Sequence, residues 1–267
     1  MNPFICCLNK DRLEFIRTRL NIICPIILLG CAAMVLLSTA YMPYLLDRAM
    51  EVTDLMSTDM SISSFMEKFF PRDLKGSLGI FSSDIGVFYS LAIIFLTHAL
   101  LPTDISLGRF ILPLCAGHTE NSLFLSKQLV YSFLCAVPVF PCYMLYYYIG
   151  VLFLENNYSI NSVVFNALML SIAEFSIVYI TIALSVLYKH KRLSLLTMTI
   201  FVMVAPDLLS FFKFGSYLPT YIFTYLYRSE NNIKKLLFPA LSLLLVLVII
   251  DAIIMRRPFI IHVDDRR

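Results

Sequence analysis

Charged residues are scarce in this sequence. Asp, Glu, Lys and Arg together make up 15% of its 267 residues, whereas hydrophobic residues make up 59%. A soluble protein of this length could not bury so much apolar surface, because its helices need polar faces that point toward water. The low charge content therefore excludes a soluble domain and predicts a protein that lies in a lipid bilayer.

Motifs for catalysis and cofactor binding are also absent from the sequence. It contains neither a GxxxxGK[ST] loop for nucleotide phosphates nor an HExxH zinc motif. Its four histidines are scattered, and no Cys and His residues have the spacing of a zinc site. Enzymatic activity and a metal site are therefore not expected in this chain. Nucleic-acid binding is not expected either, because no basic stripe is interleaved with exposed aromatic residues.

Six long apolar stretches account for most of the chain. A helix needs about 20 apolar residues to cross a bilayer. The stretches of this kind are Ile22–Leu46, Ser83–Leu101, Leu129–Phe153, Asn161–Leu187, Leu193–Phe212 and Leu236–Met255. We therefore expect an all-α integral membrane protein with six transmembrane helices. Residues 1–267 are expected to form one domain, with a lead over 1–21, the six spans within 22–255 and a tail over 256–267.

The distribution of Lys and Arg predicts how these helices are oriented. Positive charge favours the cytoplasmic side of a membrane. Lys and Arg are more frequent in the N-terminal lead, Pro102–Gln128, Tyr188–Arg192 and the C-terminal tail than in the segments on the opposite side. We therefore expect a multi-pass protein of the plasma membrane with both termini in the cytoplasm.

The N-terminal lead has the pattern of an amphipathic helix. Asn9 is a suitable N-cap for a helix over Lys10–Leu20, and Leu13, Ile16 and Leu20 recur at helical spacing. Charged residues fill much of the remaining surface. This pattern predicts a short helix that lies on the cytoplasmic leaflet before the first span.

Acidic residues within the apolar stretches are candidates for function, because a charge in the bilayer is costly. Glu174 lies deepest in a predicted span, Asp207 follows Pro206 in the fifth, and Asp251 lies near the end of the sixth. Two interpretations remain open for Glu174. Its side chain either faces a functional cavity or forms a structural hydrogen bond with a neighbouring helix.

The loop Pro102–Gln128 is longer and more apolar than a simple connection needs. A loop with an apolar face of its own is usually a site of interaction with another molecule. We predict a short helix near Gly117–Ser126 that docks on a separate protein, with Phe124 as its anchor. The residues expected to contribute to this coupling are Gly117, His118, Thr119, Glu120, Leu123 and Phe124.

The layout of the chain resembles the permease subunits of type-2 ABC exporters. Asp104, Gly108, Thr119 and Lys127 fall where that family has an acid, a Gly, a Ser and a Lys in its first cytoplasmic loop. Arg109, Gly117 and Glu120 replace the Thr, Pro and Arg that are usual there, and the segment around Pro219 resembles the family's outer re-entrant element.

The resemblance implies an N-terminal elbow helix and a coupling helix between spans two and three. It also implies two partners, a separate ATPase subunit that binds ATP and Mg and a second permease subunit in a homo- or heterodimer. The leading hypothesis is therefore the transmembrane subunit of an ATP-driven exporter. Alternatives are a secondary transporter or channel that uses Glu174 and Asp207 for ion coupling, and a membrane-embedded enzyme or scaffold.

Overall fold

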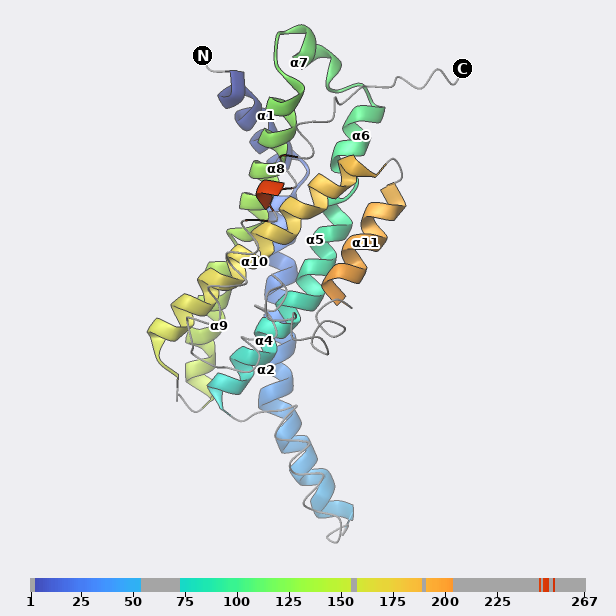
Figure 1. Cartoon of the computed structure of the whole chain (residues 1–267). Coiled ribbons are helices and arrows are strands. Elements are labelled where there is room, and N and C mark those ends of the chain that lie inside the picture. The colour runs from blue at the N-terminus through green and yellow to red at the C-terminus, as the bar shows by residue number, and fades with distance from the viewer. Residues whose placement is uncertain are drawn as a thin grey trace.

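The computed structural model describes residues 3–53, 73–154, 158–188 and 191–203, together with 245, 247–249 and 252. The described chain is all-helical and has no strands (Figure 1). Its first helices are α1 (Pro3–Arg17), α2 (Leu20–Thr53), α4 (Leu74–Asp84), η1 (Ile85–Tyr89), α5 (Ser90–Thr97), α6 (Leu100–Ser106) and α7 (Ile111–Cys115). The helices that follow are α8 (Glu120–Ala136), α9 (Val139–Phe153), α10 (Ile160–Leu187) and α11 (Lys191–Met203).

Four helical segments are long and apolar enough to cross a membrane. They are Leu20–Tyr41, Leu74–Ser106, Glu120–Phe153 and Ile160–Leu187. Each corresponds to one of the first four predicted spans. Of the predicted fifth span the structure describes a part within α11, and most of the sixth lies outside the described residues. The structure thus has an all-helical fold with four candidate membrane-spanning helices.

The N-terminal helix α1 is longer than the predicted Lys10–Leu20 and begins earlier. It ends at Arg17, and Arg19 has a positive φ of 60°, which breaks the chain direction before α2 begins at Leu20. The prediction that Leu20 belongs to this helix is therefore wrong. Phe15 is buried on the face of α1 that packs against α8, whereas Leu13 is exposed on the other side.

The helical segment that contains the predicted second span begins at Leu74, before the predicted Ser83. Asp73 caps α4, because its Oδ1 accepts a hydrogen bond from the Gly76 backbone N–H at 3.3 Å. α4 contains several polar residues, and these are accommodated because they have hydrogen-bond partners inside the bundle. Ser77 hydrogen-bonds the Tyr146 hydroxyl, and Ser82 donates to the Leu78 carbonyl at 2.8 Å.

A π-helical turn, η1, interrupts the same span between α4 and α5. Ser90 directly follows it, and its Oγ reaches the Ile85 carbonyl five residues back at 3.4 Å. π-turns inside α-helices are rare and often occur at functional sites. This one places Tyr89 and Ser90 in the core of the bundle, where both are fully buried.

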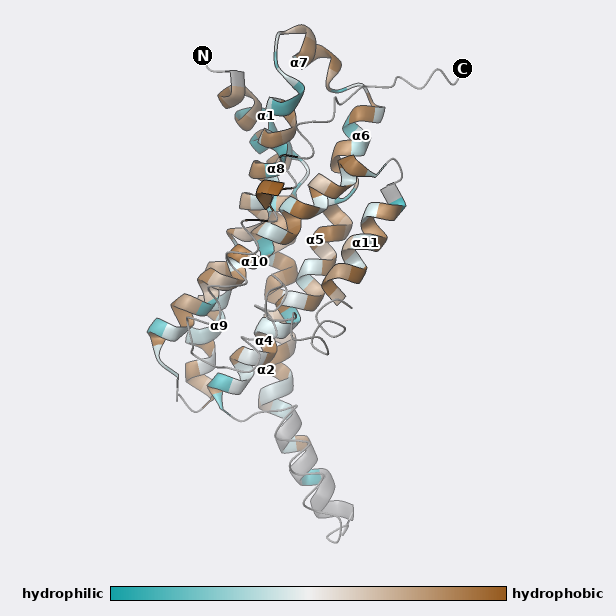
Figure 2. Ribbon diagram, viewed as in Figure 1, coloured by the Kyte–Doolittle hydropathy of each residue, from teal (hydrophilic) through white to brown (hydrophobic). Residues whose placement is uncertain are grey.

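The centre of the bundle is formed by α8 and α10, which pack closely against each other. Further contacts join α10 to α5, α6, α9 and α11, and α2 packs against α9 and α4. Hydrophobic residues recur along the whole length of these helices, while hydrophilic ones are frequent where α1 meets α8 (Figure 2). The polar contacts at that end form the first candidate site.

Candidate functional site

A cluster of charged side chains joins α1, α6, the turn after α6 and α8 at one end of the bundle. Lys127 Nζ on α8 forms ion pairs with Asp104 Oδ2 and, at 3.3 Å, with Glu14 Oε2 on α1. Arg109 in the loop adds contacts from its guanidinium to Asp104 at 3.0 Å and to Glu14 at 3.4 Å. Two cations thus face two acids, and the four residues come from α1, α6, the turn after α6 and α8. We call these four residues the charge cluster.

The inner pair of the charge cluster is shielded from solvent. The side chains of Lys127 and Asp104 are 1% and 4% exposed, whereas those of Glu14 and Arg109 are 20% and 54% exposed. Breaking a buried ion pair by removing one partner leaves an uncompensated charge, which costs about 3–5 kcal/mol. The inner pair therefore holds the loop against the bundle. The ion pair between Glu14 and Arg109 contributes less stability, because solvent and salt screen it.

Asp11 adds a second connection between α1 and α8. Its carboxylate accepts a hydrogen bond from Ser126 Oγ, and burial raises the pKa of this carboxyl group above its ordinary value. Next to it, the rings of Phe15 and Tyr131 form an edge-on contact with centroids 5.3 Å apart. α1 is thus attached to α8 by polar and aromatic contacts together.

The loop between α6 and α8 depends on two glycines. Gly108 and Gly117 have positive φ values of 66° and 86°, a conformation that residues with a Cβ rarely adopt. At Gly108 a Cβ would also come within 3.1 Å of Ile111 Cδ1. These two turns place the short helix α7 at the tip of the loop, beyond the ends of the surrounding helices (Figure 1).

The loop tip exposes three apolar side chains. Leu107, Ile111 and Leu112 are 60%, 51% and 81% exposed. They come from the turn after α6 and from α7, so they belong to one compact structure that the charge cluster holds in place. We call these three residues the loop-tip surface. An exposed apolar surface on a well-ordered loop suits the docking of another protein.

The predicted coupling helix over Gly117–Ser126 is not present as a separate element. α8 begins at Glu120 and continues without interruption through Ala136, so these residues open the third span. Leu123 and Phe124 are each only 3% exposed, because they occupy the inner face of α8. Phe124 thus offers little exposed surface in this chain, and its role as a docking anchor stays a prediction.

The other predicted coupling residues lie at the turn before α8. Gly117 makes the turn, and the Thr119 side chain caps α8 by accepting from the Ser122 backbone N–H at 3.3 Å. His118 Nδ1 lies 3.4 Å from Cys7 Sγ on α1, and Glu120 is the first residue of the helix. These residues shape the loop. Whether they take part in coupling stays a prediction.

The acids that α1 contributes to the site were not predicted from the sequence. Glu14 was expected on the polar surface of an amphipathic helix and Asp11 was not singled out, although both side chains contact α8. Their spacing of three residues places them on one helix face, which was the available signal. Without the third-span lysine as a known neighbour, this signal could not be distinguished from a solvated surface.

Glu174 on α10 forms a second candidate site in the middle of the bundle. Its side chain is fully buried, and Oε1 accepts a hydrogen bond from Ser90 Oγ at 2.7 Å. Oε2 has no partner among the described residues. Asp207 and Asp251, the other predicted intramembrane acids, lie outside the described residues. The structure therefore provides one anchoring contact for Glu174 and leaves half of its carboxyl group unpaired.

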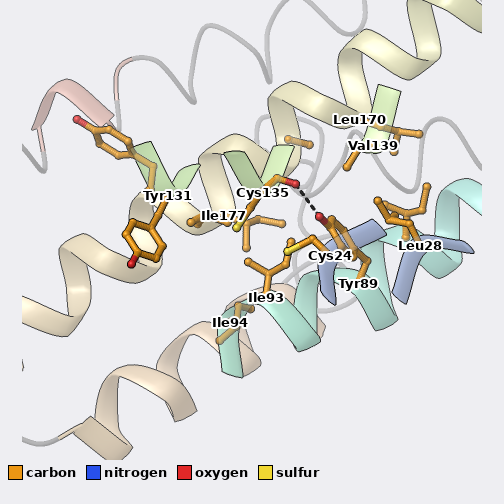
Figure 3. Close-up of a cluster of buried hydrophobic side chains, with 14 of the residues drawn as sticks. Cys24, Leu28, Tyr89, Ile93, Ile94, Tyr131, Cys135, Val139, Leu170 and Ile177 are labelled. Carbon is orange, nitrogen blue, oxygen red and sulfur yellow. Dashed lines mark hydrogen bonds between the residues drawn. The ribbon is translucent and has the colours of Figure 1, made fainter. Parts of the chain in front are cut away.

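The surroundings of Glu174 include thiol and phenol groups from three helices. Figure 3 shows Cys24 of α2, Cys135 of α8 and Tyr89 of η1 side by side, with the Tyr89 hydroxyl donating to the Cys135 carbonyl at 2.6 Å. All three are buried. These neutral groups can donate or accept hydrogen bonds, but they cannot balance a carboxylate charge.

Neither candidate site has the composition of a metal centre. Within the described ranges, no three His, Cys, Asp or Glu side chains are grouped so that they could hold a metal ion. Comparisons of the chain with protein-family models, curated proteins and solved structures find no match.

Proposed function

We propose that the chain is the transmembrane subunit of an ATP-driven exporter of the type-2 ABC class. The observation that carries the proposal is the loop-tip surface, an exposed apolar surface on a loop that is held rigidly by a buried ion pair. A partner that pushes on this surface can move α8 and α1 with it, because the charge cluster joins all three. Such a connection suits the transmission of work from a separate ATPase that binds ATP and Mg.

The four residues that carry the family resemblance support this proposal through their roles in the loop. Asp104 and Lys127 form the buried ion pair. Gly108 has the positive φ of its turn, and Thr119 caps α8. Each of these four residues therefore helps to build the loop that is proposed to dock. None of these roles requires a contact with the partner.

The proposal also includes the orientation of the chain in the membrane and a second subunit. We place six spans in the bilayer, with both termini and the loop-tip surface in the cytoplasm. In this orientation α1 is the interfacial elbow helix, and its exposed Leu13 and Ile16 face the lipid while its buried face contacts α8. A second permease subunit, identical or related, completes the translocation pathway.

A substitution at the loop-tip surface tests this function. Leu112→Asp places a charge at the most exposed of the three positions, where the fold does not depend on it. We expect the full-length variant to insert normally into host membranes but to lose a copurifying ATP-hydrolysing subunit. The matched control is Asn121→Asp, which adds the same charge at an exposed position near the loop. Equal ATPase recovery with both variants would contradict the proposal.

The unpaired carboxyl oxygen of Glu174 favours a second candidate function. A secondary transporter or channel needs an intramembrane acid that can bind an ion, and such acids are functional candidates. The distinguishing measurement is the energy source of transport in reconstituted vesicles. Dependence on ATP and the partner supports the exporter, whereas transport by the purified chain alone in an ion gradient supports the carrier.

A further inference from the structure

Four buried polar atoms on α8 and α10 have no hydrogen-bond partner in the part of the chain that the structure describes. They are Gln128 Oε1, the Tyr131 hydroxyl, Ser132 Oγ and Glu174 Oε2. Buried polar groups are nearly always paired with protein or with ordered water, because an unpaired one costs about 1–3 kcal/mol. Four such atoms in one region point to water as the missing partner.

These atoms follow the interface between α8 and α10. Gln128, Ser132 and Cys135 are spaced by four and three residues, so they lie on one face of α8. At one end of this face Gln128 Nε2 donates to the Tyr179 carbonyl of α10 at 3.1 Å. At the other end the Cys135 thiol lies within electrostatic range of Glu174. Ser132 lies between them on the same face of α8, and its buried Oγ has no partner among the described residues.

Tyr131 connects this row with the α1 end of the bundle. Its hydroxyl lies within electrostatic range of Glu14 and Asp11 on α1, and also of Cys135 farther along α8. Glu14 is partly exposed, with 20% of its side chain accessible to solvent. Polar groups therefore extend from the solvent boundary at Glu14, past Tyr131 and Ser132, to the buried carboxyl group of Glu174.

We propose that this row holds bound water molecules, through which the Glu174 carboxyl group exchanges its proton with the side of the membrane on which α1 lies. In the release step, the O–H bond of Glu174 breaks and the proton passes to a water molecule beside Ser132. Successive transfers between water molecules carry it past Tyr131 to a carboxylate at the solvent boundary, such as Glu14. The reverse sequence reloads Glu174, and no other reactant is consumed.

The neighbours of Glu174 explain why its proton is held at rest. The groups that face it are Ser90 of α5, Cys24 of α2, Cys135 of α8 and Tyr89 of η1. Each of them is neutral when protonated, so a bare carboxylate here would be buried without a compensating charge. Glu174 is therefore protonated at rest, and it gives up its proton only along the row of water molecules. The inference does not depend on the ATPase proposed above.

The presence of water can be tested by hydroxyl-radical footprinting of the full chain in lipid nanodiscs. Tyr131, Tyr89 and Tyr143 are all almost completely buried, which makes them matched reporters. The hydroxyls of Tyr89 and Tyr143 are paired with the Cys135 carbonyl and Ser82 Oγ, whereas that of Tyr131 is not. We expect several-fold faster modification of Tyr131 than of the other two. Equal slow modification of all three would overturn the proposal.

Proton exchange can be tested with dicyclohexylcarbodiimide, which reacts with protonated carboxyl groups in apolar surroundings. We expect labelling of Glu174, detected by mass spectrometry and absent in Glu174→Gln, to fall as the pH on the α1 side rises. In the Ser132→Ala and Gln128→Leu variants, Glu174 should still be labelled, but its labelling should lose most of this pH response. The control Ser185→Ala, whose hydroxyl bonds the Ile182 carbonyl of its own helix, should keep it. If the labelling of Glu174 in the parental chain does not change with pH, proton exchange through this row is refuted.

Discussion

Asp104 and Glu174 are both buried acids, but their surroundings differ in charge. Asp104 contacts the cations Lys127 and Arg109, whereas Glu174 receives one hydrogen bond from a neutral serine. A paired carboxylate keeps its charge and fixes the segments around it, while an unpaired one is stable only when it is protonated. The comparison indicates a rigid connection at the loop end of the bundle and a group in its middle that can change its charge.

The largest expected effect comes from removing the cation that pairs with Asp104. Lys127→Met keeps the length and apolar stem of the side chain but leaves the buried Asp104 carboxylate with only the exposed Arg109. We expect a loss of about 3–5 kcal/mol in stability, measured by thermal unfolding in detergent. The control Lys127→Arg keeps the charge and should lose much less. Similar losses for both variants would show that shape matters more than charge here.

A double-mutant cycle sharpens the same point. Combining Asp104→Asn with Lys127→Met removes both charges of the inner pair, so no unpaired charge remains in the interior. The double variant should be more stable than the sum of the two single losses predicts, with a coupling energy of about 1–3 kcal/mol. Strictly additive losses would mean that the pair is not coupled in the folded protein.

Glu174 should respond in the opposite way to loss of charge. Glu174→Gln is neutral, has nearly the same shape and still offers an oxygen to Ser90 Oγ. If Glu174 is protonated at rest, this substitution should cost no more than about 1 kcal/mol in thermal unfolding. Glu174→Ala should cost more, because it leaves a cavity and an unpaired Ser90. A large loss for Glu174→Gln would place a charged carboxylate at this position.

The smallest effect concerns Asp11 and the pH dependence of stability. Burial raises the pKa of this carboxyl group in the folded chain above its ordinary value of 3.8, so the folded state binds its proton more tightly than the unfolded state. Its contribution to stability is therefore full below pH 3.8 and is lost as pH rises through the folded pKa. Thermal unfolding measured as the pH rises from below the ordinary pKa of 3.8 should show this fall, and Asp11→Asn should remove it.

The sequence predicted some helices closely and others poorly, for physical reasons. The fourth span was expected over Asn161–Leu187 and is found over Ile160–Leu187, because polar residues bound its apolar run on both sides. The second span was predicted too short, because the serines of α4 appear exposed in the sequence. In the structure Ser77 and Ser82 find partners on other helices, which no local pattern can show.

For the candidate sites too, the sequence predicted some features, whereas others depend on contacts between helices. The loop pattern singled out Asp104 and Lys127, but it did not predict that they are buried or that they pair, and only the structure shows this contact. The burial of Phe124 could not be read from the sequence, since it depends on where α8 begins and on what packs against it. Exposed anchors therefore had to be found from the structure, and they are the three residues of the loop-tip surface.

The π-turn η1 has a consequence for how the two sites are connected. A π-turn contains one more residue than an α-turn, so converting Ile85–Tyr89 to α-helix without a deletion rotates the following chain by roughly 100°. That rotation would move Ser90 away from Glu174 and turn α5 with it. Deleting one residue within the turn would remove the π geometry and keep both flanking faces in place. The extra residue thus sets the direction in which Ser90 meets Glu174 and the orientation of α5, the helix that leads to α6 and the loop tip.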